Sequence, residues 1–277
     1  MRKYIYSILT VAMSLFTFSS CSYDDGVERG GDKDMKITLY EYSVSAPLSV
    51  DNDLHLRVCG NNLVQEVYYK VFSETDYSQL SESAIVDKIK SEGTKAELAE
   101  DPQNGGYVAD FVVKDMVNAC RIAIVGVNGN NYSFASTEFF GLQYEDICKG
   151  KYKFASFYEE SIGGVAPAEV VLQKCTNKEG IYRFKDLYGT GFSLKFYLTG
   201  ETAKDKDGNV YKEIYSPSND TPYSYGSYGQ VFTRDYYTYK GSNIGAFYDN
   251  NRVKLCMNYY VSAGSLGSAW EDFIPAE

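Results

Sequence analysis

Histidine is nearly absent from this chain, which limits the chemistry that the sequence can support. His55 is the only histidine in 277 residues, and it lies on the polar side of a segment that alternates like a strand. A serine, histidine and aspartate arrangement needs the base within hydrogen-bond reach of the nucleophile. The most nucleophile-like run, around Ser265, lacks the first glycine of a nucleophile elbow and lies far from His55 along the chain. The sequence therefore predicts no catalytic residues.

Metal-ligand spacing is also missing. The cysteines after position 21 are odd in number and contain no C-x-x-C pair, which argues against zinc; they are Cys59, Cys120, Cys148, Cys175 and Cys256. Asp205, Asp207 and Asn209 have the spacing of calcium ligands, but glycine comes fourth in this run, whereas an EF-hand loop has it sixth. A hairpin turn at Asp207-Gly208 is the main prediction, a weak calcium site is the alternative, and no cofactor is expected.

The chain also has fewer basic than acidic residues. The chain has 27 Lys and Arg against 37 Asp and Glu, a net charge of −10. Such a surface repels phosphate backbones and anionic headgroups, so nucleic acid is not an expected partner and membrane attachment would have to come from lipid. Helical periods are scarce, whereas 27 Tyr and 15 Phe favour strands. We therefore expect an all-β protein.

The first twenty residues lack the length of apolar chain that a membrane span requires. Arg2 and Lys3 precede an apolar run from Ile5 to Phe18, which hydroxyl residues interrupt, and small residues end the segment. This three-part order is typical of a secretory signal peptide, and a spanning helix needs about 20 apolar residues. Residues 1–20 are therefore predicted to be a signal peptide.

A lipidation signal follows the leader. Phe18-Ser19-Ser20-Cys21 resembles the bacterial lipobox, although phenylalanine replaces the usual leucine at its first position. The resemblance implies cleavage before Cys21 and acylation of its thiol; simple cleavage that leaves Cys21 unmodified or disulfide-bonded is the alternative. Asp24-Asp25 resembles the surface-export tag of Bacteroidetes lipoproteins. Residues 21–35 hold little to bury and are expected to form a flexible tether.

Residues 36–141 are expected to form a first domain of strands. Leu54, Leu56 and Val58 alternate with polar residues, which indicates one buried face, and similar segments recur through residue 139. The succession looks like a fibronectin type III or immunoglobulin-like sandwich. Residues 81–90 have helical spacing before Gly93, and we expect this helix to cover an open sheet edge.

Residues 142–277 are expected to form an antiparallel β-barrel of the calycin or lipocalin type, or a second β-sandwich. Strand-like runs begin near Gly150, Glu169, Gly180 and Phe192, and Asp249-Asn250-Asn251 predicts a tight turn. Together with terminal Phe273-Ile274-Pro275, these runs are similar to the C-terminal domain of Bacteroidetes surface lipoproteins with a fibronectin-like first domain. That resemblance implies an outer-membrane or cell-surface location and no settled activity.

Aromatic residues interleaved with Ser, Gly, Asn and Asp make residues 211–239 the main candidate for binding. Tyrosine offers a flat apolar face and a hydroxyl, which suits recognition of sugars or proteins. The stretch is expected to be a long loop, although half of its rings could fill the core instead. The candidate ligand-binding residues are Tyr215, Tyr223, Tyr225, Tyr228, Tyr236, Tyr237 and Trp270.

Three functions are weighed against one another. The leading hypothesis is a non-catalytic surface lipoprotein that binds an extracellular glycan or protein through its second domain. The second is a structural or accessory subunit of an envelope complex. The third is a glycosidase that uses carboxylates alone, but the neighbouring acids Glu159-Glu160 and Glu271-Asp272 would point to opposite faces of a strand.

Overall fold

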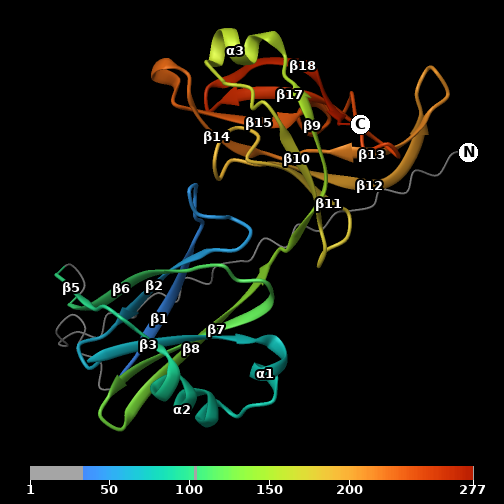
Figure 1. Cartoon of the computed structure of the whole chain (residues 1–277). Helices are drawn as coiled ribbons and strands as arrows, with labels where there is room; N and C mark the ends of the chain where they lie inside the picture. Colours follow the sequence, from blue (N-terminus) through green and yellow to red (C-terminus); the bar gives the residue numbers. More distant parts are fainter. Residues whose placement is uncertain (1–33, 103–104, 277) are drawn as a thin grey trace, which may run out of the picture.

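A computed structural model describes residues 34–276 apart from 103–104, so the predicted leader, the tether and Cys21 lie outside the described residues. Strands dominate the described chain, as the composition indicates. They form two units, which we call the two-sheet unit (residues 34–141) and the barrel unit (residues 142–276). Figure 1 shows the units one above the other, joined where β8 runs on into β9.

The two-sheet unit contains two four-stranded sheets, with the orders β1-β2-β6-β5 and β4-β3-β7-β8. Side chains from both sheets meet in one core, where Leu56, Val58, Val67 and Ile122 are fully buried. The elements are β1 (Ile37–Tyr42), β2 (Leu54–Gly60), β3 (Glu66–Ser73), α1 (Glu74–Ser78), α2 (Glu82–Glu92), β4 (Thr94–Ala96), β5 (Ala99–Asp101), β6 (Gly106–Val113), β7 (Asn118–Asn128) and β8 (Asn131–Gly141).

The predicted helix exists, but its predicted role was wrong. Ser81 caps the start of α2 by accepting a hydrogen bond from the backbone of Ala84, and the helix ends at Gly93. Ile85, Val86 and Ile89 pack against Val125 and its neighbours on the outer face of β3 and β7, so α2 covers a sheet face and not an edge. The reason is that β7 is apolar on both faces, so each face needs a partner.

The barrel unit is a closed antiparallel barrel of eight strands, so of the two predicted architectures the barrel is confirmed. The ring runs β17-β16-β13-β12-β11-β10-β9-β18 and closes where β18 pairs with β17. The elements are β9 (Tyr144–Lys153), α3 (Ser156–Ile162), β10 (Val170–Cys175), β11 (Ile181–Lys185), β12 (Leu194–Lys204), β13 (Val210–Tyr215), β14 (Asn219–Ser224), the 3₁₀ turn η1 (Gly226–Tyr228), β15 (Gln230–Asp235), α4 (Tyr236–Lys240), β16 (Gly245–Tyr248), β17 (Val253–Val261) and β18 (Gly264–Pro275).

One strand of the ring also carries a side hairpin. On one edge, β17 pairs with β16 through Val253 and Lys254 and then with β15 through Met257 to Tyr260. Its other edge pairs with β18 from end to end. The hairpin of β14 and β15 therefore extends the sheet without taking part in ring closure.

Aromatic rings fill the barrel. Phe184 is fully buried and its ring centre lies 4.9 Å from that of Phe273, and Phe196 and Tyr152 pack around it. Helix α3 adds Tyr158, whose ring stacks on Phe154 at 4.0 Å. Nine of the 20 buried residues in this core are aromatic, so large rings supply much of the apolar burial of the barrel unit.

The tyrosine-rich stretch is not a loop, so that prediction was wrong. Residues 211–239 hold most of β13, all of β14 and β15, and most of α4. Tyrosine, phenylalanine and threonine all pack well on a pleated surface, which favours strands in this stretch. Asp207-Gly208 lies in a turn between β12 and β13, where Gly208 has a φ of +85° that favours glycine.

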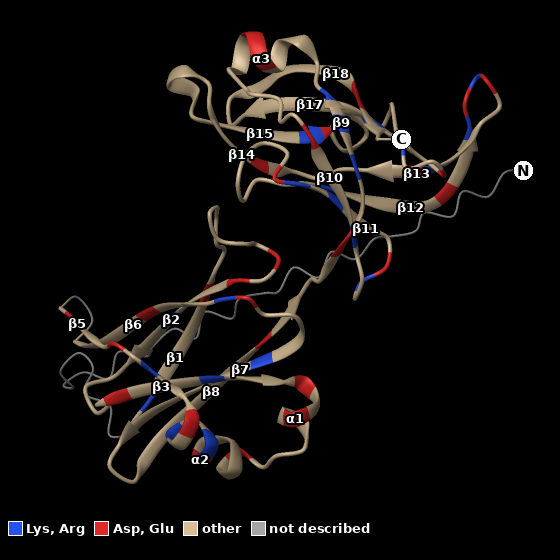
Figure 2. Cartoon of the chain, viewed as in Figure 1, with Lys and Arg blue, Asp and Glu red and all other residues tan. Residues whose placement is uncertain are grey.

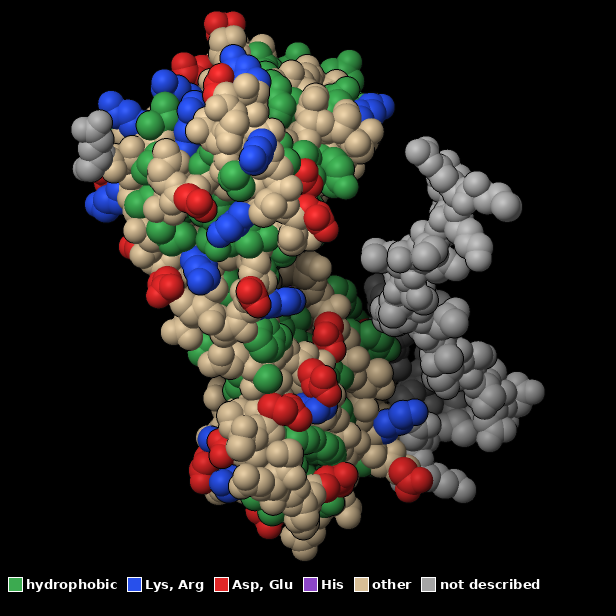
Figure 3. All heavy atoms as spheres, turned by 90° about the vertical axis from the view of Figure 1, so that its right-hand side faces the viewer, with side chains coloured by type: hydrophobic (Ala, Val, Ile, Leu, Met, Phe, Trp, Pro, Cys, Tyr) green, Lys and Arg blue, Asp and Glu red, His purple; other side chains and the backbone are tan. Residues whose placement is uncertain are grey.

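The two units differ in charge. Residues 34–141 hold 16 acidic and 8 basic residues, whereas residues 142–276 hold 16 and 15. Figure 2 shows both signs along the barrel strands, and Figure 3 shows hydrophobic side chains in small groups among charged ones on the face in view. The negative charge that argues against nucleic acid therefore comes mainly from the two-sheet unit.

Candidate ligand-binding site on the outside of the barrel

A groove of about 490 Å³ crosses the outer face of the barrel over β13, β16, β17 and β18. Side chains alternate across a strand, so the neighbours of the buried residues Ile214, Phe247, Leu255 and Phe273 face outward. The groove is lined by Asp205, Tyr211, Ile244, Ala246, Tyr248, Lys254, Trp270, Glu271 and Asp272.

Three aromatic residues give the groove its apolar surface. Trp270 is the only tryptophan of the chain, and it is 54% exposed, which is a large fraction for an aromatic residue. Tyr211 and Tyr248 are directly opposite each other in the pairing of β13 with β16, and their ring centres lie 5.6 Å apart at an angle of 53°. Flat rings in a hollow offer stacking surfaces to the apolar face of a ligand.

Charged groups flank the rings. Arg252 donates from Nε to Asp272 at 2.9 Å and forms an ion pair with it, and this hydrogen bond and charge raise the pKa of the guanidinium. Lys254 pairs with Asp272 across the β17–β18 ladder. Carboxylates and amines beside exposed rings can form hydrogen bonds with the hydroxyls of a polar ligand.

The candidate calcium ligands form a closed turn at one end of this groove. The Asp205 carboxylate accepts hydrogen bonds from the backbone N–H groups of Asp207 and Asn209, each at 2.9 Å, and from the Asn209 side chain. These bonds hold the pKa of Asp205 below its ordinary value. Tyr248 Oη also donates to Asp205 at 3.4 Å. In the described part of the chain, no three His, Cys, Asp or Glu side chains gather as a metal site.

Of the seven predicted binding residues, only Trp270 lines the groove. Tyr215 stacks on Tyr197 on β12 at 5.4 Å. Tyr225 and Tyr228 stack at 6.2 Å around η1, the tip of the side hairpin, and Tyr228 is 58% exposed. Tyr236 and Tyr237 belong to α4.

Tyr223 is the predicted binding residue that the structure places against the barrel core. Its hydroxyl accepts a hydrogen bond from Tyr158 at 3.1 Å and donates to the backbone carbonyl of Tyr188 at 3.2 Å. These bonds hold α3 against the strands. This ring is part of the packing, as the core alternative for this stretch anticipated.

A buried carboxyl group inside the barrel was missed from sequence. Glu271 is only 2% exposed, and its carboxylate accepts hydrogen bonds from Tyr259 at 2.8 Å, Tyr152 at 3.0 Å and the backbone N–H of Ala155 at 3.2 Å. Burial outweighs these bonds and raises the pKa of Glu271 to about 7. Glu271 and Asp272 therefore face opposite sides of β18, as the strand argument anticipated for this pair of acids.

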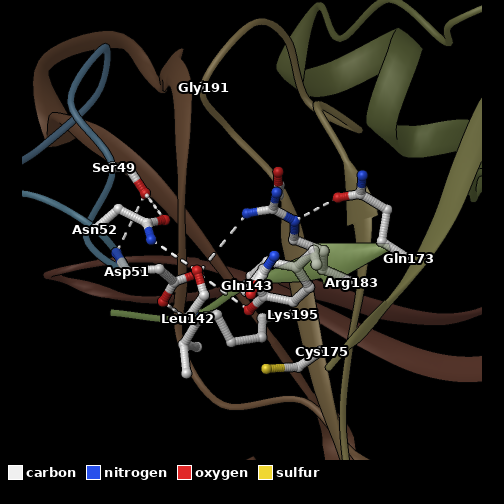
Figure 4. A network of polar contacts seen from close by, with 12 residues as sticks. Ser49, Asp51, Asn52, Leu142, Gln143, Gln173, Cys175, Arg183, Gly191 and Lys195 are labelled. Carbon is white, nitrogen blue, oxygen red and sulfur yellow. Dashed lines mark hydrogen bonds and ion pairs between the residues drawn. The ribbon is translucent and has the colours of Figure 1, made fainter. Parts of the chain in front are cut away.

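A second polar network joins the two units, and Figure 4 shows it from close by. Asp51, from the loop between β1 and β2, forms ion pairs with Lys195 and, at 3.8 Å, with Arg183 of the barrel. It also accepts a hydrogen bond from Tyr144 at 3.1 Å. The adjacent Asn52 donates to the carbonyl of Leu142 at 2.7 Å. The sequence offered no signal for this network, because its contacts between the units join residues that are 90 to 144 positions apart.

The remaining candidates lie apart from one another. His55 lies 3.3 Å from Asp110 in the two-sheet unit, whereas Ser265 Oγ accepts a hydrogen bond from Asn258 in the barrel. Glu159 and Glu160 are on helix α3. The expectation that they point to opposite faces assumed a strand, so it does not apply to this pair. The five cysteines of the described chain are free thiols.

No protein-family profile matches the chain, and no curated protein matches its sequence. Within residues 34–276 apart from 103–104, no helix has the length and apolar character to cross a membrane. The groove and the leader are therefore the features of the chain that bear on its function.

Proposed function

We propose that the protein is an exported, lipid-anchored binding protein of a bacterial cell surface that holds an extracellular glycan in the groove of the barrel. The observation that supports this proposal is Trp270, a 54% exposed ring that shares a hollow with two tyrosines and the carboxylates of Asp205 and Asp272. Burial of an aromatic side chain removes a large apolar area from water, so a ring left open in a groove suits a stacking ligand. In this proposal the protein is not an enzyme.

We extend the proposal to the fold family of each unit. Two four-stranded sheets around one core, with a helix inserted between β3 and β4, support a fibronectin type III or immunoglobulin-like assignment of the first unit. The eight-strand ring supports a calycin or lipocalin-like barrel. With the lipobox-like Cys21 and Asp24-Asp25, these features support membership among Bacteroidetes surface lipoproteins.

Replacing Trp270 with alanine is expected to weaken glycan binding at least about tenfold, because the stacking surface is lost. The native protein and its variants can be titrated with a panel of neutral oligosaccharides by isothermal titration calorimetry, and in the native protein the fluorescence of Trp270, its only tryptophan, can be followed as well. Tyr228→Ala removes an equally exposed ring at the hairpin tip and is expected to leave binding unchanged. A panel that never alters Trp270 emission, or undiminished binding by the alanine variant, would contradict the proposal.

Lipid attachment is tested on the intact chain produced in a bacterial host. Mass spectrometry of the membrane fraction is expected to find an N-terminal peptide that begins with an acylated Cys21, and Cys21→Ser is expected to lack the acyl group and to keep its uncleaved leader. Cys59→Ser is the matched control and should be cleaved and acylated like the native chain. A native chain with an uncleaved or unmodified N-terminus, or a Cys21→Ser variant that is processed like the native chain, would refute the anchor.

A second candidate function is that of an accessory subunit of an envelope complex. Tyr40 and Tyr42 are both exposed on β1, which favours contact between the two-sheet unit and another protein. Cross-linking in intact cells separates the two functions. A constant protein partner that depends on Tyr40 supports the subunit, whereas a glycan binder needs none.

A further inference from the structure

A second hollow, of about 460 Å³, lies between the two units. One wall is the loop of residues 46–52 from the two-sheet unit, and the other walls come from β11, β12 and the segments that follow β11 and β13. Small-molecule sites of about 300–1,000 Å³ occur preferentially at such boundaries between units. This cleft and the outer groove have no lining residue in common.

The polar network of Figure 4 supplies Arg183, Lys195 and Asp51 to this cleft, whose lining holds three cations and three anions in all. Arg183 and Lys195 have side chains 20% and 18% exposed, and between them they share one carboxylate, Asp51, which is 9% exposed. Both oxygens of Asp51 are engaged, one by Lys195 and the other by Tyr144 and Arg183. Arg183 and Lys195 are therefore neutralised by only one carboxylate within their own network, and in this partly desolvated place they attract an acceptor more strongly than they would at an open surface.

The hydrogen-bond donors there are also in excess. A guanidinium has five N–H groups and an ammonium three. Contacts with the described residues engage Nε of Arg183 with Gln173 at 2.7 Å, Nη1 of Arg183 with Asp51, and one N–H of Lys195 with Asp51. These contacts leave the second terminal nitrogen of Arg183 and two N–H groups of Lys195 for a further acceptor.

The guanidinium is held in place before any ligand arrives. Its carbon lies 3.7 Å from the centre of the Tyr144 ring, so it stacks on that ring. Gln173, which accepts from Arg183, is itself oriented by donating to Asp146 at 2.6 Å. A donor whose orientation is fixed loses less entropy when it binds, which favours recognition of a planar carboxylate.

The other wall groups are compatible with a sugar acid. Phe192 and Tyr197 present half-buried rings, and the Asp186 carboxylate accepts the backbone N–H of Gly191 at 2.8 Å. With Lys185, Asp186 and Asp220 the lining holds equal numbers of cations and anions, so the spare donors of Arg183 and Lys195, and not a net charge, favour an anionic acceptor. Rings beside cationic donors can accept the apolar face of a sugar and its carboxylate together.

We propose that the cleft between the units is a binding site for a small carboxylated ligand, with a uronic acid as the class that fits its rings and its cations. Arg183 and Lys195 would bind the carboxylate, and Phe192 and Tyr197 would contact the sugar ring. This site is separate from the Trp270 groove, and the inference does not depend on the function proposed for that groove.

The test compares two ligands of nearly the same shape, one with a carboxylate and the other with an uncharged carboxamide in its place. Isothermal titration calorimetry of the full chain with glucuronate is expected to show binding, and glucuronamide is expected to bind at least about tenfold more weakly. Affinity for glucuronate should fall as salt is added, because the attraction is screened. Equal affinity for the acid and the amide, or no heat with millimolar glucuronate, would overturn the proposal.

Variants assign the binding to the cleft. Lys195→Gln leaves Asp51 paired with Arg183 and is expected to weaken glucuronate binding at least about tenfold, with an unchanged circular dichroism spectrum. Lys254→Gln, in the outer groove, is the matched control and should bind like the native chain. Trp270→Ala should also bind glucuronate normally, which separates this result from that of the glycan test. Undiminished binding by a folded Lys195→Gln variant would refute the site.

Discussion

An Asp51→Asn variant is expected to lose about 3 kcal/mol of the free energy of unfolding, with the loss at the junction of the two units. The substitution keeps the shape of the side chain but leaves Arg183 and Lys195 as two like charges that are less than a quarter exposed. It also weakens the acceptor of the Tyr144 hydroxyl. Breaking a largely buried ion pair by removing one partner costs more than the pair contributes, because the remaining charges stay desolvated.

The measurement is urea unfolding with two probes. Trp270 emission reports the barrel alone, and far-ultraviolet circular dichroism reports both units. In the variant, the two transitions should separate because the junction no longer couples the units. Asp110→Asn is the matched control: it removes an ion pair with Arg57 whose side chains are 44% and 37% exposed, and a loss below about 1 kcal/mol is expected. A variant no less stable than this control would contradict the proposed role of Asp51.

The barrel is expected to lose about 3 kcal/mol of stability as the pH rises from about 4.5 to about 7. Burial raises the pKa of Glu271 to about 7 in the folded protein, whereas its ordinary value is 4.5. The folded state therefore binds this proton more tightly than the unfolded state does. The stabilisation is complete below pH 4.5 and is lost as the pH passes through the folded pKa.

The hydrogen bonds to Glu271 favour its charged form and oppose the effect of burial, which is the larger of the two. The groups that face it are the hydroxyls of Tyr152 and Tyr259 and the backbone N–H of Ala155, and Tyr188 lies close enough to interact with its charge. Burial also raises the pKa of Asp235. The pKa values of Asp110 and Asp205 are lowered, so these carboxyls lose their stabilisation only at pH values below the window of Glu271.

Glu271→Gln tests this assignment. The amide cannot ionise, so the variant should lose much less barrel stability than the native chain between pH 4.5 and 8, as followed by Trp270 emission in urea, and the loss that remains should come from Asp235. Glu169→Gln is the matched control: Glu169 is 54% exposed and paired with Lys149, and this variant should keep the native slope. A native chain that gains stability over this range, or a Glu271→Gln variant with the native slope, would refute the prediction.

Strand alternation made much of the fold predictable. Leu54, Leu56 and Val58 alternate as a half-buried strand should, and all three are buried in β2. Ser81 and Gly93 set the ends of α2, because a hydroxyl cap and a terminal glycine are local signals. Ring closure was not decided by such patterns, because a barrel and a sandwich share the same alternation and differ only in which distant strands pair.

Elements with weak local signals were missed. Helix α3 has no side-chain cap, and Phe157 and Tyr158 are residues that also suit strands, so its helical state depends on the barrel beneath it. The groove could not be predicted in full, because its lining depends on strand register. Trp270 was predicted as a contact residue, but Tyr211 and Tyr248 meet beside it only because β13 pairs with β16. Glu271 carried no sequence signal, because alternation alone does not say which face of β18 is inside.

Strand β17 pairs with the ring and with the side hairpin through different residues, so the hairpin can change in length without affecting ring closure. Val253 and Lys254 pair with β16 within the ring, whereas Met257 to Tyr260 pair with β15. Extra residues inserted between Gly226 and Ser227 would therefore project from η1 and leave the eight-strand ladder unchanged. The molecule thus offers a position where a foreign peptide can be displayed on a scaffold whose closure does not depend on the graft.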